Sequence, residues 1–314
     1  NFIEKDIKVF FQNRHSPLNE TQILEFDKII LAGGPFFKKQ LLINNLSLRK
    51  PELFLEKIIL FGGGWKPIIG DETDRLNYLY DKRSIKILDS ISTPIGTRDF
   101  DTLFNLSKNG IQNVSYSGCP AWFAKNSFQD KIIFDEIPNN PVCLCTAPQT
   151  DHLQLQFRNL LCSLTKQGYR IKAAFNKGFE TSEQKYTKEW ILENLNIYSY
   201  DTSGPSTFPE IMNSCDLHIG FRVHSHIYSL ISFIPSLLIP EDGRGFSINR
   251  LFGFSRLHAF KRSNNSIIIN ENLVNEIEDL IVNTNISENS YKYMNIMKDL
   301  NLLTEKFLHK TFIR

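Results

Sequence analysis

The sequence has little of what marks membrane, secreted or nucleic-acid-binding proteins. Its longest apolar run, residues 227–240, is interrupted by serine and proline and is shorter than the roughly 20 residues of a membrane-spanning helix. The formal net charge of +2 is too small to suggest a protein that binds nucleic acid. No charged segment followed by an apolar one opens the chain, which begins at Asn1 rather than Met. We therefore expect a cytoplasmic protein.

Cysteine is also scarce, and its spacing excludes two kinds of stabilising site. The five cysteines are an odd number, and no pair of CxxC motifs is present. Neither a disulfide framework nor a structural zinc site is indicated, which fits a reducing compartment. Cys143 and Cys145 lie two residues apart in "VCLC", so they would share one face of a strand and act as small core residues.

Length and composition favour a globular protein of two domains. The chain has 314 residues, of which 41% are hydrophobic and 22% charged, and that length exceeds the usual size of a single domain. The segment "DEIPNNPVC", residues 135–143, has the proline and asparagine content of a linker. We expect an N-terminal domain at 1–138 and a C-terminal domain at 139–314.

The first half has the pattern of a buried parallel sheet. Three Ile/Leu-rich runs, at 28–35, 57–65 and 85–92, are separated by stretches long enough for helices, so we predict a strand in each. Asp99 or Thr97 is suited to cap a following helix that stops at Gly110, which places Arg98 just before a helix N-terminus. A further strand is predicted at 113–123, ending in a Gly-Cys-Pro turn.

The second half repeats the alternation of strands and helices. Predicted strands begin at "VCLCTAPQ", "YRIKAAF", "NIYSY", "DLHIGF" and "IPSLLI", and helices lie between them. The fold class is therefore α/β with two parallel sheets in series and a helical C-terminus. The last helix has lysines along one side. This pattern fits a solvated face on a packed helix, or contact with a membrane surface.

One apolar stretch, "IGFRVHSHI" at 219–227, carries three polar side chains that could bind an anion. Gly220 permits close approach of the backbone, Arg222 offers a planar fork to a carboxylate or phosphate, and Ser225 can cap the helix that begins there. His224 beside such an anion is suited to act as a general acid. In the alternative interpretation, Arg222 pairs with a buried carboxylate and the histidines form hydrogen bonds within the core.

A metal site at these histidines is not expected. His224 and His226 would lie on one face of a strand, where they could share a metal, but on a helix they point to different faces. The apolar residues that follow, beginning with Ile227, have helical spacing. We therefore expect His226 to be a core residue or to support its neighbours.

Further polar and glycine-rich segments are candidates for substrate binding. "PEDGRG" at 240–245 places Glu241, Asp242 and Arg244 after a strand, where a carboxylate could accept a proton, or forms a charged surface turn. The glycine runs lack the spacing of a dinucleotide site and indicate close approach or tight turns. Trp65 could stack on a sugar ring or pack in the core. "DFD" at 99–101 fits helix capping better than metal binding. The glycine candidates are Gly33, Gly34 and Gly63.

The order of these segments resembles the polysaccharide pyruvyl transferase family. "IGFRVHSHIYSLISFIPSLLI" looks like the family's C-terminal signature, with Arg-x-His between a strand and a helix. "IILAGGPFF" resembles its N-terminal strand and glycine turn, and "GTRDFDTLFNLSKNGIQNVSYSGCP" resembles its Arg-Asp helix and the strand that follows. The match spans about residues 27–255 in order.

The resemblance implies a fold, a reaction and site residues. It implies two Rossmann-like domains facing a central cleft, as in GT-B glycosyltransferases, with the acceptor on the N-terminal side and the donor on the C-terminal side. The donor would be phosphoenolpyruvate, no other cofactor would be needed, and the acceptor would be a sugar or a lipid-linked oligosaccharide at the inner face of the membrane. Arg222 and His224 would belong to the donor site, and Arg98 and Asp99 correspond to the family's Arg-Asp pair.

Two other functions fit the same pattern. A GT-B glycosyltransferase that uses a sugar nucleotide would hold its diphosphate at the same kind of arginine-bearing helix N-terminus. A glycan-binding protein without catalytic activity would share the fold. Incubation of the protein with a panel of donors distinguishes these functions. Release of phosphate from phosphoenolpyruvate indicates a pyruvyl transferase, whereas consumption of a sugar nucleotide indicates a glycosyltransferase.

Overall fold

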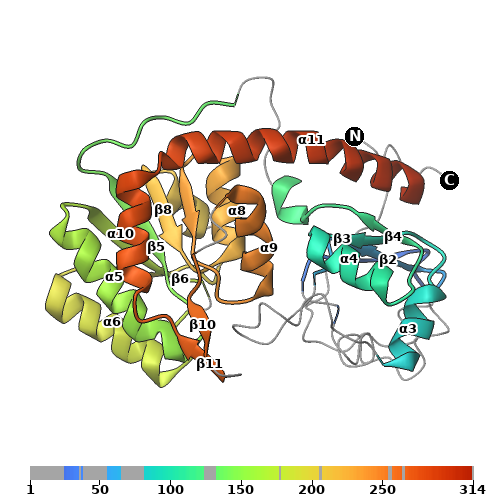
Figure 1. The fold of residues 1–314 in the computed structure, drawn as a ribbon, viewed down its shortest axis with the longest axis horizontal. Helices are drawn as coiled ribbons and strands as arrows, with labels where there is room; N and C mark the ends of the chain where they lie inside the picture. Colours follow the sequence, from blue (N-terminus) through green and yellow to red (C-terminus); the bar gives the residue numbers. More distant parts are fainter. Residues whose placement is uncertain are drawn as a thin grey trace. The chain divides into compact units, whose positions relative to one another are not determined.

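The protein, described by a computed structural model, consists of two compact units (Figure 1). The structure describes residues 25–34, 37, 55–64, 81–123, 132–176, 178–204, 207–253, 257–263 and 266–312. The first unit comprises the described residues of Asn1–Pro67, Thr73–Pro120 and Asp299–Arg314, and the second comprises those of Ala121–Lys298. This division lies before the predicted linker at 135–143. The domain boundary at 138 stays a prediction.

The first unit contains parallel strands, as the sequence predicts. Strand β1 pairs with β2, and β3 pairs with β4. Gly63 joins the two pairs, because its N–H donates to the Gly96 carbonyl at 3.0 Å and its carbonyl accepts from the Arg98 N–H at 2.9 Å. The strands and helices of this part of the chain are β1 (Ile29–Ala32), β2 (Ile58–Phe61), α3 (Lys82–Asp89), β3 (Ile95–Thr97), α4 (Phe100–Lys108) and β4 (Val114–Tyr116).

The strand predicted at 85–92 is wrong, because this segment lies largely in helix α3. Asp81 caps the helix by accepting a hydrogen bond from the Ser84 N–H at 2.8 Å. Ser84, Ile87 and Leu88 are buried, and they lie on one face of the helix at helical spacing. A short apolar run fits either element. The cap and the spacing of the buried residues favour the helix. The next strand, β3, begins at Ile95.

The second unit is built on a five-stranded parallel sheet in the order β7-β6-β5-β8-β9. Its strands are β5 (Val142–Thr146), β6 (Arg170–Phe175), β7 (Ser199–Asp201), β8 (Leu217–Gly220) and β9 (Ser236–Leu238). After β5 the chain adds β6 and β7 on one side and then returns to add β8 and β9 on the other. The strand order therefore reverses between β5 and β8, and ligands of open α/β sheets bind at the carboxyl ends of strands at such a point.

Helices cover both faces of this sheet. Figure 1 shows α5 and α6 on one side and α8 on the other; α8 packs against β8 and β9, and α5 against α6 and α10. Cys143 and Cys145 are fully buried in β5, as predicted. From Pro120 to Phe312, the helical segments of the described residues are η3 (Pro120–Phe123), η4 (Asp151–Leu153), α5 (Gln154–Lys166), α6 (Ser182–Leu195), α7 (Thr207–Met212), α8 (Val223–Ile231), α9 (Gly243–Phe252), α10 (Leu273–Asn283) and α11 (Ile286–Phe312).

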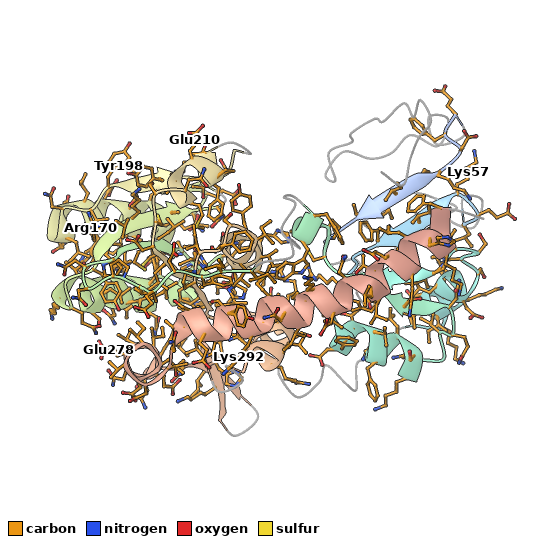
Figure 2. The ribbon with its side chains drawn as sticks, turned by 90° about the horizontal axis from the view of Figure 1, so that it is seen from above. Lys57, Arg170, Tyr198, Glu210, Glu278 and Lys292 are labelled. Carbon is orange, nitrogen blue, oxygen red and sulfur yellow. The ribbon has the colours of Figure 1, made fainter. Side chains whose placement is uncertain are left out.

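The C-terminus is helical, as predicted, and a short hairpin precedes it. Strands β10 (Phe260–Ser263) and β11 (Ser266–Ile269) are antiparallel and were not expected from the sequence. Helix α11 has 27 residues and carries Lys292 on its surface, where the lysine pairs with Glu288 one turn earlier (Figure 2). None of the helices within the described ranges combines the length and apolarity needed to cross a bilayer.

Candidate functional site

Arg222 lies where β8 passes into α8, at the carboxyl edge of the sheet. It is the N-cap residue of α8 with φ −102° and ψ 114°, and no side chain of the described residues caps this helix. The first backbone hydrogen bond of the helix runs from the His226 N–H to the Arg222 carbonyl at 3.0 Å. The N–H groups of residues 223–225 precede that bond, so this helix start has the partial positive charge that attracts anions.

The prediction that Ser225 caps this helix is wrong. The chain is already helical at Val223, so Ser225 lies inside the first turn. Its hydroxyl instead accepts a hydrogen bond from Asn176 Nδ2 at 3.0 Å. The contact ties the start of α8 to the end of β6, one strand beyond β5 in the sheet.

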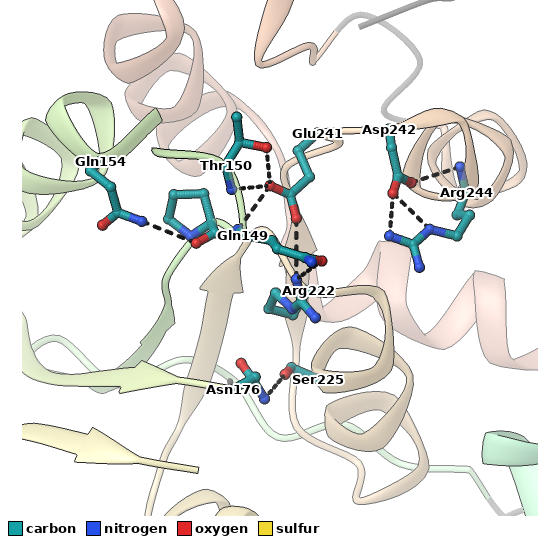
Figure 3. Close-up of polar contacts among 10 residues, drawn as sticks. Gln149, Thr150, Gln154, Asn176, Arg222, Ser225, Glu241, Asp242 and Arg244 are labelled. Atoms are coloured by element: carbon teal, nitrogen blue, oxygen red, sulfur yellow. Dashed lines mark hydrogen bonds and ion pairs between the residues drawn. The ribbon is translucent and has the colours of Figure 1, made fainter. Parts of the chain in front are cut away.

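The guanidinium of Arg222 binds two side chains from neighbouring strand ends (Figure 3). Its Nη1 donates to Gln149 Oε1 at 2.9 Å and to Glu241 Oε1 at 3.4 Å. The Arg222 side chain remains 20% exposed, whereas that of Glu241 is 6% exposed. Burial lowers the pKa of Arg222, and Glu241 opposes that shift. The alternative in which Arg222 pairs with a buried carboxylate is thus confirmed, although the Arg222 side chain is not fully buried.

Glu241 is held on both of its oxygens. Its Oε2 accepts from the Gln149 N–H at 2.9 Å and from the N–H and hydroxyl of Thr150, each at 3.3 Å. Burial raises the pKa of Glu241 above its ordinary value, although Arg222 and the Gln149 N–H act in the opposite direction. Glu241 therefore links the loop after β5 to the arginine after β8.

Asp242 and Arg244 form a second ion pair directly beside the first. Asp242 is the N-cap residue of α9 and accepts from the Arg244 N–H at 3.0 Å. The Arg244 side chain also donates to Asp242 Oδ2, from Nε at 2.7 Å and from Nη2. Burial alone would lower the pKa of Arg244, but Asp242 outweighs it and raises that pKa. The idea that "PEDGRG" forms a surface turn is wrong, since Glu241 and Asp242 are buried.

A small pocket opens at this edge of the sheet. It encloses about 200 Å³ of space, part of which is open solvent. The end of β5, the end of β6, the N-terminal turn of α6 and Arg222 contribute to its wall. The lining residues are Ala147, Pro148, Gln149, Phe175, Asn176, Gly178, Gln184 and Arg222. Arg222 and the side-chain amides give the pocket a wall of polar hydrogen-bonding groups.

The two histidines of "RVHSH" have different surroundings. His224, in the first turn of α8, is exposed, so its imidazole is accessible to solvent. His226 is fully buried, and its Nδ1 lies 2.7 Å from Ser236 Oγ. The prediction that His226 is a core or supporting residue is confirmed. The core-bound alternative therefore applies to His226, whereas His224 remains a candidate acid.

The first unit holds the other predicted polar pair. Asp99 caps α4 by accepting from the Thr102 N–H at 2.7 Å, as predicted. Arg98 Nε lies 3.7 Å from Asp99 Oδ2, and both residues are buried. A Cβ on Gly64 would collide with the Arg98 guanidinium. The last glycine of "FGGG" is therefore needed for the close approach of an arginine.

The other glycines of the first unit form tight turns at the strand ends. Gly33 and Gly34 follow β1 with φ values of 63° and 96°, which favour glycine. Pro120, from the Gly-Cys-Pro turn after β4, lies near Gly33, and a Cβ on Gly62 would collide with its ring. Gly63 bridges β2 and β3 through its backbone. The predicted role in tight turns and close approach is confirmed. Trp65 lies outside the described residues.

The predicted site residues thus form two groups, each within one unit. Arg222, Glu241, Asp242 and Arg244 form two adjacent ion pairs in the second unit, with His224 two residues from Arg222. Sequence reasoning missed Gln149 and Asn176, which lie after β5 and β6. Their position after strands of the same sheet was the available signal, since carboxyl ends of parallel strands meet at one edge.

Comparison with solved structures shows the fold class. The complex of S. aureus MnaA with UDP has a TM-score of 0.50 and 12% identity, covering 90% of this chain and 76% of its own. A putative UDP-N-acetylglucosamine 2-epimerase from Listeria monocytogenes also has a TM-score of 0.50 and 12% identity, covering 86% and 70%. These are GT-B-like proteins, so the predicted α/β, GT-B-like class with a helical C-terminus is confirmed. No curated protein sequence matches the chain.

A family model supplies the identification that a fold alone cannot. The model described as polysaccharide pyruvyl transferase matches residues 2–243. The match runs from the N-terminal strands through β8, α8 and Glu241 to the first residue of α9. The chain belongs to the polysaccharide pyruvyl transferase family.

Proposed function

We propose that this protein transfers the pyruvyl group of phosphoenolpyruvate to two hydroxyls of one sugar in a surface polysaccharide or its precursor, forming a ketal. The observation that carries the proposal is the position of Arg222. It occupies the N-cap position of α8 without a side-chain capping hydrogen bond, at the switch point of a parallel sheet, and it lines a small polar pocket. A donor with a carboxylate and a phosphate suits that setting, because both groups match the planar guanidinium fork.

In this proposal, Arg222 and His224 carry out different tasks. Arg222 binds the carboxylate or the phosphate of the donor and orients it. His224, which is exposed in the first turn of α8, acts as the general acid. An anion nearby favours the protonated form of an imidazole, so donor binding itself prepares His224 to give up a proton to the donor.

The reaction balances with one proton given and two taken. His224 protonates the methylene carbon, so the double bond becomes a methyl group and the adjacent carbon becomes cationic. One sugar hydroxyl attacks that carbon and loses its proton, and phosphate departs with the electron pair of its C–O bond. The second hydroxyl then attacks the same carbon and loses its proton. One of the two hydroxyl protons restores the protonated form of His224, and the other is taken by the departing phosphate, which leaves as hydrogen phosphate. The products are a cyclic ketal and inorganic phosphate.

The remaining candidates are proposed to bind substrates. Asp242 and Arg244 lie beside the Arg222–Glu241 pair and would bind part of the donor or the sugar. In the first unit, Arg98, Asp99 and the turn glycines would contribute to the acceptor side. No cofactor beyond the donor is part of the proposal.

The first experiment compares donors without requiring a known acceptor. Isothermal titration calorimetry of the full chain is carried out with phosphoenolpyruvate and, separately, with UDP-glucose. The proposal predicts that phosphoenolpyruvate binds and that inorganic pyrophosphate competes weakly with it. Binding of UDP-glucose without binding of phosphoenolpyruvate would instead support a glycosyltransferase.

The second experiment measures turnover. Phosphate release from phosphoenolpyruvate is followed with a panel of methyl hexosides that differ in which hydroxyl pair is free. Phosphate release that depends on one hexoside, together with a product heavier by one pyruvyl ketal in mass spectrometry, supports the proposal. No release with any hexoside, combined with no donor binding, would contradict it.

A further inference from the structure

The charges at the carboxyl edge of the second unit's sheet already cancel. Arg222 pairs with Glu241, and Arg244 pairs with Asp242. The charged groups that act on Glu241 within the described residues are Arg222, Asp242 and Arg244. Two guanidinium groups and two carboxylates give no net charge. The cluster therefore has no uncompensated cation ready for a ligand that carries several negative charges.

An anionic donor must compete with Glu241 for the same guanidinium. Glu241 Oε1 lies 3.4 Å from Arg222 Nη1, and Arg222, whose side chain is 20% exposed, lines the pocket. A carboxylate or phosphate on Arg222 would bring a like charge close to Glu241. Because Glu241 is buried, solvent and salt would screen that repulsion only weakly.

Protonation of Glu241 would remove the repulsion between its carboxylate and the donor anion, and the surroundings of Glu241 favour that protonation. Arg222 is the cation that contacts the Glu241 carboxylate, so its engagement by a ligand removes the main support for the charged form. Burial already raises the pKa of Glu241 while Arg222 is still paired with it. Three donors hold Oε2 in place, from the backbone of Gln149 and from Thr150. Oε1, which faces Arg222, is the oxygen left to receive a proton.

We propose that Glu241 takes up one proton from solvent when the anionic donor binds Arg222 and returns it when phosphate leaves. The inference rests on the proposed function, because it takes phosphoenolpyruvate as the donor. The new O–H bond forms on Oε1, and no bond to the donor is made or broken in this step. Donor affinity then falls as the pH rises, since protons become scarcer while the bound state requires one. Protonation of Glu241 thereby removes one negative charge from the site when the anionic donor binds.

The direct test counts protons in the full-length protein. Calorimetric titrations with phosphoenolpyruvate are run at pH 8 in Tris and in HEPES, whose ionisation enthalpies differ, and the difference in heat gives the protons exchanged. At this pH the phosphate of the donor is largely ionised, since phosphate monoesters titrate at about pH 6. We expect an uptake of at least one proton for each donor bound, one of them by Glu241.

Two variants, at Glu241 and at His224, test which residue takes up the proton. Glu241→Gln keeps the shape but cannot ionise, so uptake should fall by about one proton and affinity at pH 8 should rise about tenfold, because Arg222 loses its competing anion. Glu189→Gln, on the exposed surface of α6, is the matched control and should retain the uptake. His224→Asn removes any proton that this imidazole takes up when the anion binds, so about one proton, the one assigned to Glu241, should still be taken up in this variant.

The outcomes separate the inference from the proposed function. Binding of phosphoenolpyruvate without proton uptake overturns the inference alone, and so does uptake that is undiminished in Glu241→Gln or absent in His224→Asn. Absence of donor binding from pH 6 to 9 overturns the proposed function. If Glu241→Gln does not fold, difference infrared spectroscopy of the wild-type protein decides. Donor binding must then produce the carbonyl band of a protonated carboxylic acid, and a spectrum without that band overturns the inference.

Discussion

His218 and His226 share one hydroxyl, that of Ser236. The Nδ1 atoms of both rings lie 2.7 Å from Ser236 Oγ, and His218 Nε2 lies 3.0 Å from Thr146 Oγ1. The four residues come from β5, β8, β9 and α8, and all are fully buried. A hydroxyl has one proton, so Ser236 donates to one ring and accepts from the other. This network connects the sheet to the helix that begins with Arg222.

Removal of the shared hydroxyl should destabilise the second unit. Ser236→Ala leaves two buried ring nitrogens without their common partner, which costs about 1–3 kcal/mol of unfolding free energy. Urea denaturation followed by circular dichroism measures the change. The matched control is Ser182→Ala, an exposed serine at the start of α6, and it should change stability by less than about 0.5 kcal/mol. Equal effects of the two substitutions would show that the network adds no stability.

The same network should make the protein sensitive to mild acid. Burial lowers the pKa of His218 to about 3 and lowers that of His226 well below its ordinary value. Between those values and the unfolded-state pKa of about 6.5, the unfolded chain binds more protons than the folded one. The stability that the two neutral histidines contribute is therefore fully present above about pH 6.5. It is lost progressively as the pH falls below that value.

The acid effect can be measured with a variant that removes one of the two titrations. Each histidine contributes a slope of up to about 1.4 kcal/mol per pH unit. His226→Asn can retain a hydrogen bond to Ser236 but does not titrate, so the slope between pH 6 and 5 should fall by roughly half. Urea denaturation of the wild type and of His226→Asn at several pH values gives the slope of unfolding free energy against pH for each protein. Parallel curves for the wild type and the variant would contradict the assignment.

The sequence predicted the architecture better than the details of the site. Continuous Ile/Leu runs and helical spacing predicted the parallel sheets, because both patterns follow from which faces are buried. The segment at 85–92 failed because a short apolar run does not distinguish a strand from a helix. The cap at Asp81, which decides the question, lies just before that segment.

Pairing between distant residues was beyond sequence reasoning. Arg222 was a clear candidate, but its partner Gln149 lies 73 positions away. Glu241 was expected at the site, yet its burial and its bonds to the loop after β5 depend on how the strand ends meet. His218 was not singled out at all, because a histidine in an apolar strand gives no sign of the serine it will contact.

Gly64 should be intolerant of even one added carbon. A Cβ at this position would collide with the Arg98 guanidinium, so Gly64→Ala should cost about 1–3 kcal/mol of stability or displace the arginine. In an Arg98→Ala background the clash disappears, and the same substitution should cost much less. Thermal unfolding of the four proteins of this cycle measures the coupling. Gly204→Ala, where the nearest atom would be at an ordinary 3.5 Å, is the control, and strictly additive effects would contradict the contact.

Arg222→Lys should weaken donor binding while the fold survives. Lysine keeps the positive charge but lacks the planar fork that holds Gln149 and the donor together. We expect the dissociation constant for phosphoenolpyruvate to rise about tenfold or more. Arg170→Lys, an exposed arginine at the start of β6 (Figure 2), is the matched control. Calorimetry gives the constants, and unchanged binding in Arg222→Lys would remove this residue from the donor site.

His224→Asn should separate binding from turnover. Asparagine keeps a polar side chain at the start of α8 but cannot deliver a proton, so kcat should fall by on the order of 100-fold or more. The dissociation constant for phosphoenolpyruvate, which depends on Arg222, should change by less than about threefold. His309→Asn, at an exposed position on α11, is the control and should leave both quantities unchanged. Phosphate release and calorimetry provide the two measurements. Full turnover in His224→Asn would mean that another group protonates the methylene carbon, and Glu241, once protonated by donor binding, would then become the first residue to test in that role.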